Sequence, residues 1–150
     1  MSTDTTHPTR IAFVCVQNAG RSQMSTALAE RERARRGLDI EILTGGTHPA
    51  DAVHEEVIET MAELDIDLSD RTPREITPVE LRACDYVATM GCSTLDVDEV
   101  RDDVDVRDWA LADPDGQDPE RVREIRDEIE ERVGVLFDEI EADGDAGAGT

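Results

Sequence analysis

The chain has 150 residues and a formal net charge of -22, from 37 acidic and 15 basic residues. A globular domain usually has about 100–150 residues, so a second folded domain is excluded. Hydrophobic residues make up 38% of the chain, which suffices for a single core and argues against disorder throughout. We predict one folded domain over residues 10–141, with disordered tails at 1–9 and 142–150.

All 15 basic residues are arginines, because the chain contains no lysine. So acidic a surface repels itself in dilute buffer, whereas salt near 1 M shortens the Debye length to about 3 Å and screens the repulsion. The composition therefore predicts a halophilic protein of a salt-rich cytoplasm. Binding to nucleic acid or to an anionic membrane requires clustered cations, so neither is expected as a partner.

The start of the chain, MSTDTTHPTR, lacks the charged and apolar regions of a signal peptide. No apolar run approaches the roughly 20 residues that span a bilayer. We therefore expect a cytoplasmic protein. Its three cysteines are an odd number, which suits reduced thiols with chemical or packing roles better than a disulfide framework.

Apolar runs alternate along the chain with helical patterns. Short apolar runs predict buried strands, and apolar residues spaced by three and four predict amphipathic helices. Strands are predicted at Ile11–Cys15, Ile40–Leu43, Tyr86–Met90 and Val104–Val106, and helices at Ser22–Arg36, Val53–Leu64 and from Asp118 onward. Strands that alternate with helices pair in parallel. The sequence thus predicts an α/β three-layer sandwich: a four-stranded parallel sheet with helices on both faces.

Local signals set the expected boundaries of these elements. Gly37 should end the first helix, and Gly45-Gly46 should form a turn after the second strand. Asp118 should cap the last helix, with Pro119 in its first turn. The stripe expected to face the core on this helix is Val122, Ile125, Ile129, Val133, Leu136 and Ile140.

The segment between the first strand and the first helix has a cysteine and an arginine five residues apart. It reads Cys15-Val16-Gln17-Asn18-Ala19-Gly20-Arg21-Ser22. The spacing alone is weak evidence for a functional motif, because it occurs by chance in roughly a third of chains of this composition. Its position is more specific, because backbone N–H groups at a helix N-terminus bind a tetrahedral oxyanion. We predict an oxyanion-binding loop over residues 16–22, with Gly20 supplying the positive φ that the turn needs.

The roles of the polar residues follow from charge and reach. Cys15 faces amides, a helix N-terminus and a guanidinium, so we expect a thiolate nucleophile. Arg21 would hold two oxygens of the anion and stabilise the transition state. Ser22 would donate a hydrogen bond to the sulfur, and Asn18 would hold the loop through its amide. The alternative is a buried cysteine at a strand end followed by a solvated helix arginine.

The segment CVQNAGRSQMS resembles the phosphate-binding loop of the low-molecular-weight protein tyrosine phosphatase family, and in particular its arsenate reductase branch, where RSQM follows the loop. The resemblance extends over about residues 10 to 140. Further similar segments are TGGTHPADAVHEEVIETMAELDIDLSDRTPREIT, TMGC and DWALADPDGQDPERVREIRDEI. It implies the low-molecular-weight phosphatase fold.

The resemblance also implies a general acid, Asp113, in the Asp-Pro pair between the last strand and the last helix. Such an acid protonates the leaving oxygen. Asp108, Asp115 and Asp118 are nearby competitors, and loop aspartates are commonly turn formers and caps. The phosphatase branch typically has aromatic residues after this pair, whereas here Asp115-Gly116-Gln117 follows and Trp109 is expected to be a core residue. This favours a small inorganic oxyanion as substrate.

In the reductase branch, a cysteine after TMG attacks the sulfur of the nucleophile once arsenate is bound, which expels arsenite and leaves a disulfide. The resemblance implies this role for Cys92. The alternatives are a small residue at a strand end, or a cysteine that protects a phosphatase nucleophile from over-oxidation. Cys84 is expected to serve packing. Thioredoxin-coupled reductases with three cysteines carry another cysteine shortly afterwards, but Ser93–Val100 has none, so the full internal relay cannot run.

The function implied is an arsenate reductase with nucleophile Cys15, oxyanion ligand Arg21, acid Asp113 and resolving thiol Cys92. No bound cofactor or metal is expected, and an external thiol (thioredoxin, glutaredoxin or a small thiol) would regenerate the enzyme. The alternatives are a protein tyrosine phosphatase or phosphomonoesterase working through a cysteinyl-phosphate, and an anion-binding or redox-sensing module without turnover. Expected partners are a small oxyanion, arsenate or a phosphate ester, and a thioredoxin-like reductant, with the chain a monomer or weak dimer.

Overall fold

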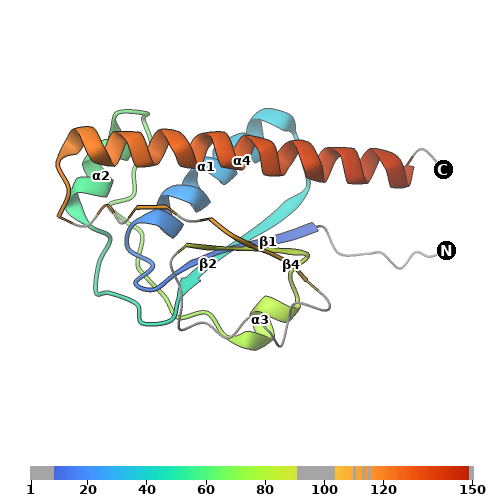
Figure 1. Cartoon of the computed structure of the whole chain (residues 1–150), viewed down its shortest axis with the longest axis horizontal. Coiled ribbons are helices and arrows are strands. Elements are labelled where there is room, and N and C mark those ends of the chain that lie inside the picture. Colours follow the sequence, from blue (N-terminus) through green and yellow to red (C-terminus); the bar gives the residue numbers. More distant parts are fainter. Residues whose placement is uncertain (1–8, 91–103, 110, 113, 115, 149–150) are drawn as a thin grey trace.

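The computed structural model describes residues 9–90, 104–109, 111, 112, 114 and 116–148 (Figure 1). Within them, four parallel strands form one sheet in the order β2-β1-β3-β4. The strands are β1 (Thr9–Cys15), β2 (Ile40–Gly46), β3 (Tyr86–Met90) and β4 (Asp105–Asp108), and the helices are α1 (Arg21–Arg36), α2 (Glu55–Ala62), α3 (Pro78–Arg82) and α4 (Pro119–Ala148). The predicted α/β architecture is confirmed.

The central strand β1 is buried on both faces. Its residues Ile11, Phe13 and Cys15 belong to a large core shared with α1, α2 and α4, whereas Ala12 and Val14 belong to a smaller core beneath α3. Figure 1 shows α1, α2 and α4 on one side of the sheet and α3 on the other. Because successive side chains of a strand point to opposite faces, a strand between two helical layers is apolar throughout.

The predicted ends of the two long helices are present. Gly37 follows α1 with a φ of 65°, and its N–H donates to the carbonyl of Arg33. At the start of α4, Asp118 Oδ1 accepts a hydrogen bond from the N–H of Arg121 at 3.0 Å. The predicted apolar stripe of α4 is buried along its length. The helix continues to Ala148, past the expected boundary at residue 141, in a segment that contains no proline to interrupt it.

The turn predicted at Gly45-Gly46 is wrong, since both residues end strand β2 and pair with Val14 and Cys15. A close approach by other segments explains why they are glycines. A Cβ on Gly45 would collide with the side chain of Ile76, and a Cβ on Gly46 would lie 2.5 Å from the carbonyl oxygen of Val16. The two glycines therefore let neighbouring segments pack against the end of β2.

The short helix α3 is not among the predicted elements. Thr77 Oγ1 accepts from the N–H of Glu80 at 3.2 Å, and Glu80 Oε1 accepts from the N–H of Thr77 at 3.0 Å. This reciprocal pair is a capping box, with a proline in the first turn. The helix closes the smaller core through the buried Leu81.

Several arginines each form ion pairs with more than one carboxylate. Arg36 pairs with Glu32 at 2.6 Å and with Glu141 at 2.5 Å, and Arg107 pairs with Asp105 at 2.9 Å and with Glu139 at 2.6 Å. The pairs join α1 and β4 to α4, yet carboxylates still outnumber arginines by 37 to 15. We therefore expect salt to screen the excess negative charge. No helix in the part of the chain described above is long and apolar enough to cross a bilayer.

We expect the melting temperature to fall by about 10 °C or more on transfer from molar potassium chloride to about 0.1 M, because the Debye length grows to about 10 Å there. Thermal unfolding followed by circular dichroism at both salt concentrations measures this. Sodium and potassium chloride should restore the melting temperature equally, since screening depends on ionic strength. A melting temperature that does not change with salt would contradict the expectation.

Candidate active site

The loop between β1 and α1 turns at Asn18. This residue has a φ of 53°, whereas Gly20 has a φ of -137° and a ψ of -94°. The positive φ predicted for Gly20 is therefore wrong. Asparagine tolerates the left-handed conformation better than most residues. Gly20 is required for a different reason, close packing, since a Cβ there would lie 2.9 Å from Cγ of Pro114.

The side chain of Asn18 holds this turn in place and is fully buried. Its Nδ2 donates to Ser22 Oγ at 2.7 Å and to Thr44 Oγ1 at 2.8 Å. Its Oδ1 accepts from the N–H of Arg74 at 3.0 Å and from Gln23 Nε2 at 3.1 Å. An amide has two donor hydrogens and two acceptor lone pairs, so every hydrogen-bonding site is used. Asn18 thus joins the loop to α1, β2 and the segment before α3.

Three carbonyl groups of the loop point toward the segment 48–54. The carbonyl oxygens of Val16, Gln17 and Ala19 accept hydrogen bonds of 2.8–2.9 Å from N–H groups of the segment 48–54. In a trans peptide the C=O and the following N–H point in opposite directions, so the N–H groups of residues 17, 18 and 20 face the other way. That of Asn18 donates to Cys15 Sγ at 3.2 Å. Those of Gln17 and Gly20 find no acceptor within the described parts of the chain.

Cys15, at the end of β1, is buried and only 3% exposed. Its Sγ lies 2.9 Å from Ser22 Oγ, in addition to its bond from Asn18. Because Ser22 Oγ already accepts a hydrogen bond from Asn18 Nδ2, its own hydrogen is available to the sulfur. Two donors that converge on a sulfur stabilise negative charge on it. The geometry is therefore suited to a sulfur nucleophile.

Arg21 is the first residue of α1, at the other end of the loop. Its Nη1 donates to the carbonyl oxygen of Leu111 at 3.0 Å, in the segment between β4 and α4. This bond orients the guanidinium relative to a segment distant in the sequence. A planar guanidinium held in this way can bind two oxygens of a tetrahedral anion. Cys15 and Arg21 therefore lie at the two ends of one short loop, whose N–H groups at Gln17, Asn18 and Gly20 face away from the segment 48–54.

Two other residues considered in the sequence, Cys84 and Trp109, pack in the core. Cys84 lies in the smaller core, and desolvation by burial, with a contribution from the Asp85 carboxylate, raises the pKa of its thiol to about 11. It is therefore a neutral packing residue near pH 7. Trp109 is buried, with its ring centroid 5.8 Å from that of Phe13, as expected for a core residue. Cys92, Asp113 and Asp115 lie outside the described residues.

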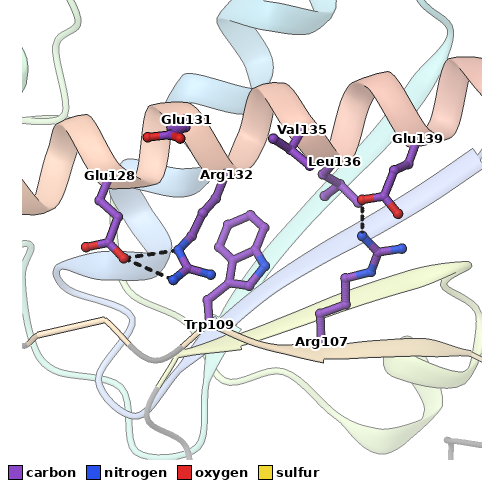
Figure 2. Close-up of a pocket in the computed structure, with 8 residues that line it drawn as sticks. All are labelled: Arg107, Trp109, Glu128, Glu131, Arg132, Val135, Leu136 and Glu139. Atoms are coloured by element: carbon purple, nitrogen blue, oxygen red, sulfur yellow. Dashed lines mark hydrogen bonds and ion pairs between the residues drawn. The ribbon is translucent and has the colours of Figure 1, made fainter.

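Trp109 also lines a cavity of about 290 Å³ between β4 and α4 (Figure 2). Val135 and Leu136 cover it from α4, and charged side chains surround it, with Arg132 bonded to Glu128. None of the residues of the Cys15 loop lines this cavity. The candidate site described above, where donors converge, is therefore separate from this cavity.

Sequence reasoning missed four residues that support the loop, namely Gln23, Thr44, Arg74 and His54. His54 Nε2 lies 3.1 Å from Gln17 Oε1, and its backbone N–H donates to Ala19. Apart from Gln23, which belongs to the RSQM motif, they lie far from the loop in the sequence, and no local pattern marks them. Among the residues described, no group of three or more His, Cys, Asp or Glu side chains is arranged to hold a metal ion.

Replacing Gly46 by alanine should destabilise the protein by about 2 kcal/mol, because overpacking forces backbone shifts. The new Cβ would lie 2.5 Å from the carbonyl oxygen of Val16 and 2.9 Å from that of Cys15. Urea unfolding in molar salt measures the change. Gly134→Ala is the control: its Cβ meets nothing within 4 Å, so α4 should gain about 0.5–1 kcal/mol. Equal free energies of unfolding for Gly46→Ala and wild type would refute the close packing.

Comparisons with known proteins agree with this fold. The model of the low molecular weight phosphotyrosine protein phosphatase family matches residues 10–146. A Halobacterium salinarum protein named "Putative arsenate reductase" is 68% identical over 145 residues, which cover 95% of this chain and 99% of that protein. A glutaredoxin arsenate reductase of Synechocystis is 34% identical over an alignment that covers 87% of this chain and 98% of that protein.

Solved structures show the same relationship. A thioredoxin-dependent arsenate reductase of Corynebacterium glutamicum superposes with a TM-score of 0.74 at 32% identity, covering 93% of this chain and 65% of that one. An arsenate reductase in a phosphate-binding state has a TM-score of 0.77 at 30% identity, over 88% and 98% of the two chains. Because the family model matches residues 10–146, nearly the whole chain, this protein belongs to the low molecular weight phosphotyrosine protein phosphatase family.

Proposed function

We propose that this protein is an arsenate reductase in which Cys15 attacks arsenate held by Arg21 and the loop amides of residues 16–22. The observation that carries the proposal is the convergence of two donors on a buried sulfur: the N–H of Asn18 donates to Cys15 Sγ at 3.2 Å, and Ser22 Oγ lies 2.9 Å from it. The arsenate reductases among the relatives support this substrate over a phosphate ester. Preorganised N–H donors of this kind stabilise charge that develops on an oxyanion.

The first step joins sulfur to arsenic. The Cys15 thiolate attacks arsenate, an S–As bond forms, and one As–O bond breaks. The leaving group is the hydroxyl of hydrogen arsenate, which departs as water after it accepts one proton, for which we propose Asp113 as the donor. Arg21 and the amides neutralise the charge on the remaining oxygens throughout. Arsenic stays in the +5 state in this step.

The second step is the reduction. The Cys92 thiolate attacks Cys15 Sγ, an S–S bond forms, and the S–As bond breaks with its electron pair left on arsenic. Arsenic leaves as arsenite in the +3 state, and the two thiols have lost the two electrons that it gained. The disulfide then requires an external dithiol or thiol. Relatives named glutaredoxin and thioredoxin-dependent arsenate reductases support a reductant of that class.

A phosphatase is the second candidate, favoured by the family to which the chain belongs. Cys15, Arg21 and Asp113 would then form and hydrolyse a cysteinyl-phosphate, and Cys92 would not take part in turnover. The two functions use the same loop and differ in the fate of the first intermediate.

A paired assay in molar salt separates them. Wild-type protein is incubated with arsenate and a thioredoxin, a glutaredoxin or a small-thiol system, and arsenite is quantified; hydrolysis of p-nitrophenyl phosphate is measured in parallel. We expect arsenite to form at the expense of reductant. Brisk ester hydrolysis, with arsenate acting only as an inhibitor, would instead establish a phosphatase.

A further inference from the structure

His54 lies against the oxyanion-binding loop at three points. Its Nε2 is 3.1 Å from Gln17 Oε1, and because an amide oxygen only accepts hydrogen bonds, the imidazole is the donor. Its backbone N–H donates to the carbonyl of Ala19 at 2.9 Å. Its ring is also close to Gly20, since a Cβ there would lie 3.6 Å from His54 Cδ2. One residue of the segment 48–54 therefore lies along the loop from Gln17 to Gly20.

His54 also occupies the N-cap position of α2, but its side chain makes no capping hydrogen bond. Serine, threonine, aspartate and asparagine are preferred at this position, because their side-chain oxygen accepts from an N–H of the first turn. The imidazole bonds instead to Gln17, its one side-chain hydrogen-bond partner among the residues that the structure describes. The residue type at this position therefore favours the contact with the loop over the stability of α2.

The N–H donors of the loop face away from the segment 48–54. The carbonyl of Ala19 is bonded to His54, so the N–H of Gly20, which belongs to the same trans peptide, points to the opposite side. This N–H and that of Gln17 have no acceptor within the described parts of the chain. Donors that are fixed before an anion arrives reduce the entropy lost on binding. A contact that fixes this arc therefore strengthens binding without touching the anion.

We propose that His54 is a positioning residue, whose imidazole holds the side chain of Gln17 and thereby keeps residues 17–20 in the conformation that binds the anion. The inference rests on the proposed function, in which the loop amides hold arsenate. The imidazole is not itself a ligand of the anion in this account. Its removal should therefore weaken anion binding by about fivefold in Kd, the order expected for the loss of one hydrogen bond.

The test compares His54→Ala with His48→Ala by isothermal titration with inorganic phosphate in molar salt. His48 is the matched control, because it is an exposed histidine of the same segment whose backbone N–H also donates to the loop, to the carbonyl of Val16 at 2.8 Å. Its ring, however, lies 3.4 Å from Oγ1 of its neighbour Thr47 and bonds to no residue of the loop. We expect Kd to rise about fivefold in His54→Ala and to stay within about 1.5-fold of wild type in His48→Ala.

Two further variants separate positioning from a contribution to folding. The amide nitrogen of His54→Gln is as many bonds from the backbone as Nε2 of histidine and can donate to Gln17, so Kd should return to within about twofold of wild type. The side chain of His54→Asn is one bond shorter but caps a helix well. This variant should melt about 3 °C higher than wild type in phosphate-free buffer and still bind phosphate about fivefold more weakly. A purely structural role would move the melting temperature and the affinity in the same direction.

The route through Gln17 is tested by a double-mutant cycle. Gln17→Ala and the double variant with His54→Ala should each show the same fivefold rise in Kd as His54→Ala, and not a product of about 25-fold. Such a product would overturn the proposal, and so would equal values of Kd for His54→Ala and His48→Ala. A His54→Gln protein that binds as weakly as His54→Ala, or a His54→Asn protein that loses melting temperature together with affinity, would overturn it as well.

Failure of the proposed function gives a different result. If wild type binds no phosphate, the loop is not an anion site, and the proposed function and the inference both fail. If wild type binds phosphate and the His54 variants behave as expected, but the paired assay yields no arsenite, the reductase proposal fails alone. If wild type binds phosphate and forms arsenite, and His54→Ala binds phosphate as tightly as His48→Ala, the inference alone falls.

Discussion

Replacing Cys15 by serine is expected to lower arsenite formation by about 10⁴-fold or more, because the nucleophile is lost. A serine hydroxyl is neutral at pH 7 and can form neither the bond to arsenic nor the disulfide that releases arsenite. The donors that converge on the sulfur, from Ser22 and Asn18, are provided by other residues and remain. We therefore expect the loop to keep binding a tetrahedral anion.

Isothermal titration with inorganic phosphate provides the second readout for Cys15→Ser. The dissociation constant should stay within about threefold of wild type, since Arg21 and the loop amides supply the binding. Cys84→Ser is the control, because that buried thiol, with its pKa raised to about 11, should not contribute to either measurement. A Cys15→Ser protein that retains more than about a hundredth of the wild-type rate would contradict a cysteine nucleophile.

Replacing Cys92 by serine should abolish arsenate reduction and leave hydrolysis of p-nitrophenyl phosphate nearly unchanged. The reason is that reduction requires a second thiol to break the S–As bond, whereas a phosphoryl group can be transferred to water. Steady-state arsenite formation and ester hydrolysis, each measured with the same protein preparation, give the two rates. Undiminished reduction by Cys92→Ser with a small thiol as reductant would show that the external thiol attacks the arsenic adduct directly.

Elements with strong local patterns were predictable from the sequence. Strand β1 is apolar because it is buried on both faces, and the stripe along α4 is spaced by three and four residues. The position of the Cys15 loop between a buried strand and a helix followed from these two kinds of pattern. The sequence also contains the capping box of α3, Thr77 with Glu80, but a helix of only 5 residues is too short to show the apolar spacing that predicts a helix.

Features set by contacts between distant segments were not predictable. Both Asn18 and Gly20 can adopt a positive φ, and the choice of Asn18 depends on Pro114, which lies over Gly20, and on Arg74, which donates to the Asn18 side chain. In the same way, Gly45-Gly46 has the composition of a turn. Only the close approach of Ile76 and of the loop backbone shows why a strand ends in two glycines.

The disulfide formed in one turnover tests the central claim most directly. Cys84→Ser protein, fully reduced and freed of reductant, is mixed with arsenate in molar salt, alkylated and digested at arginine. Cys15 and Cys92 then lie on separate peptides, 11–21 and 83–101. The account predicts one arsenite per chain and the two peptides joined by a disulfide. Two separately alkylated peptides and no arsenite would contradict it.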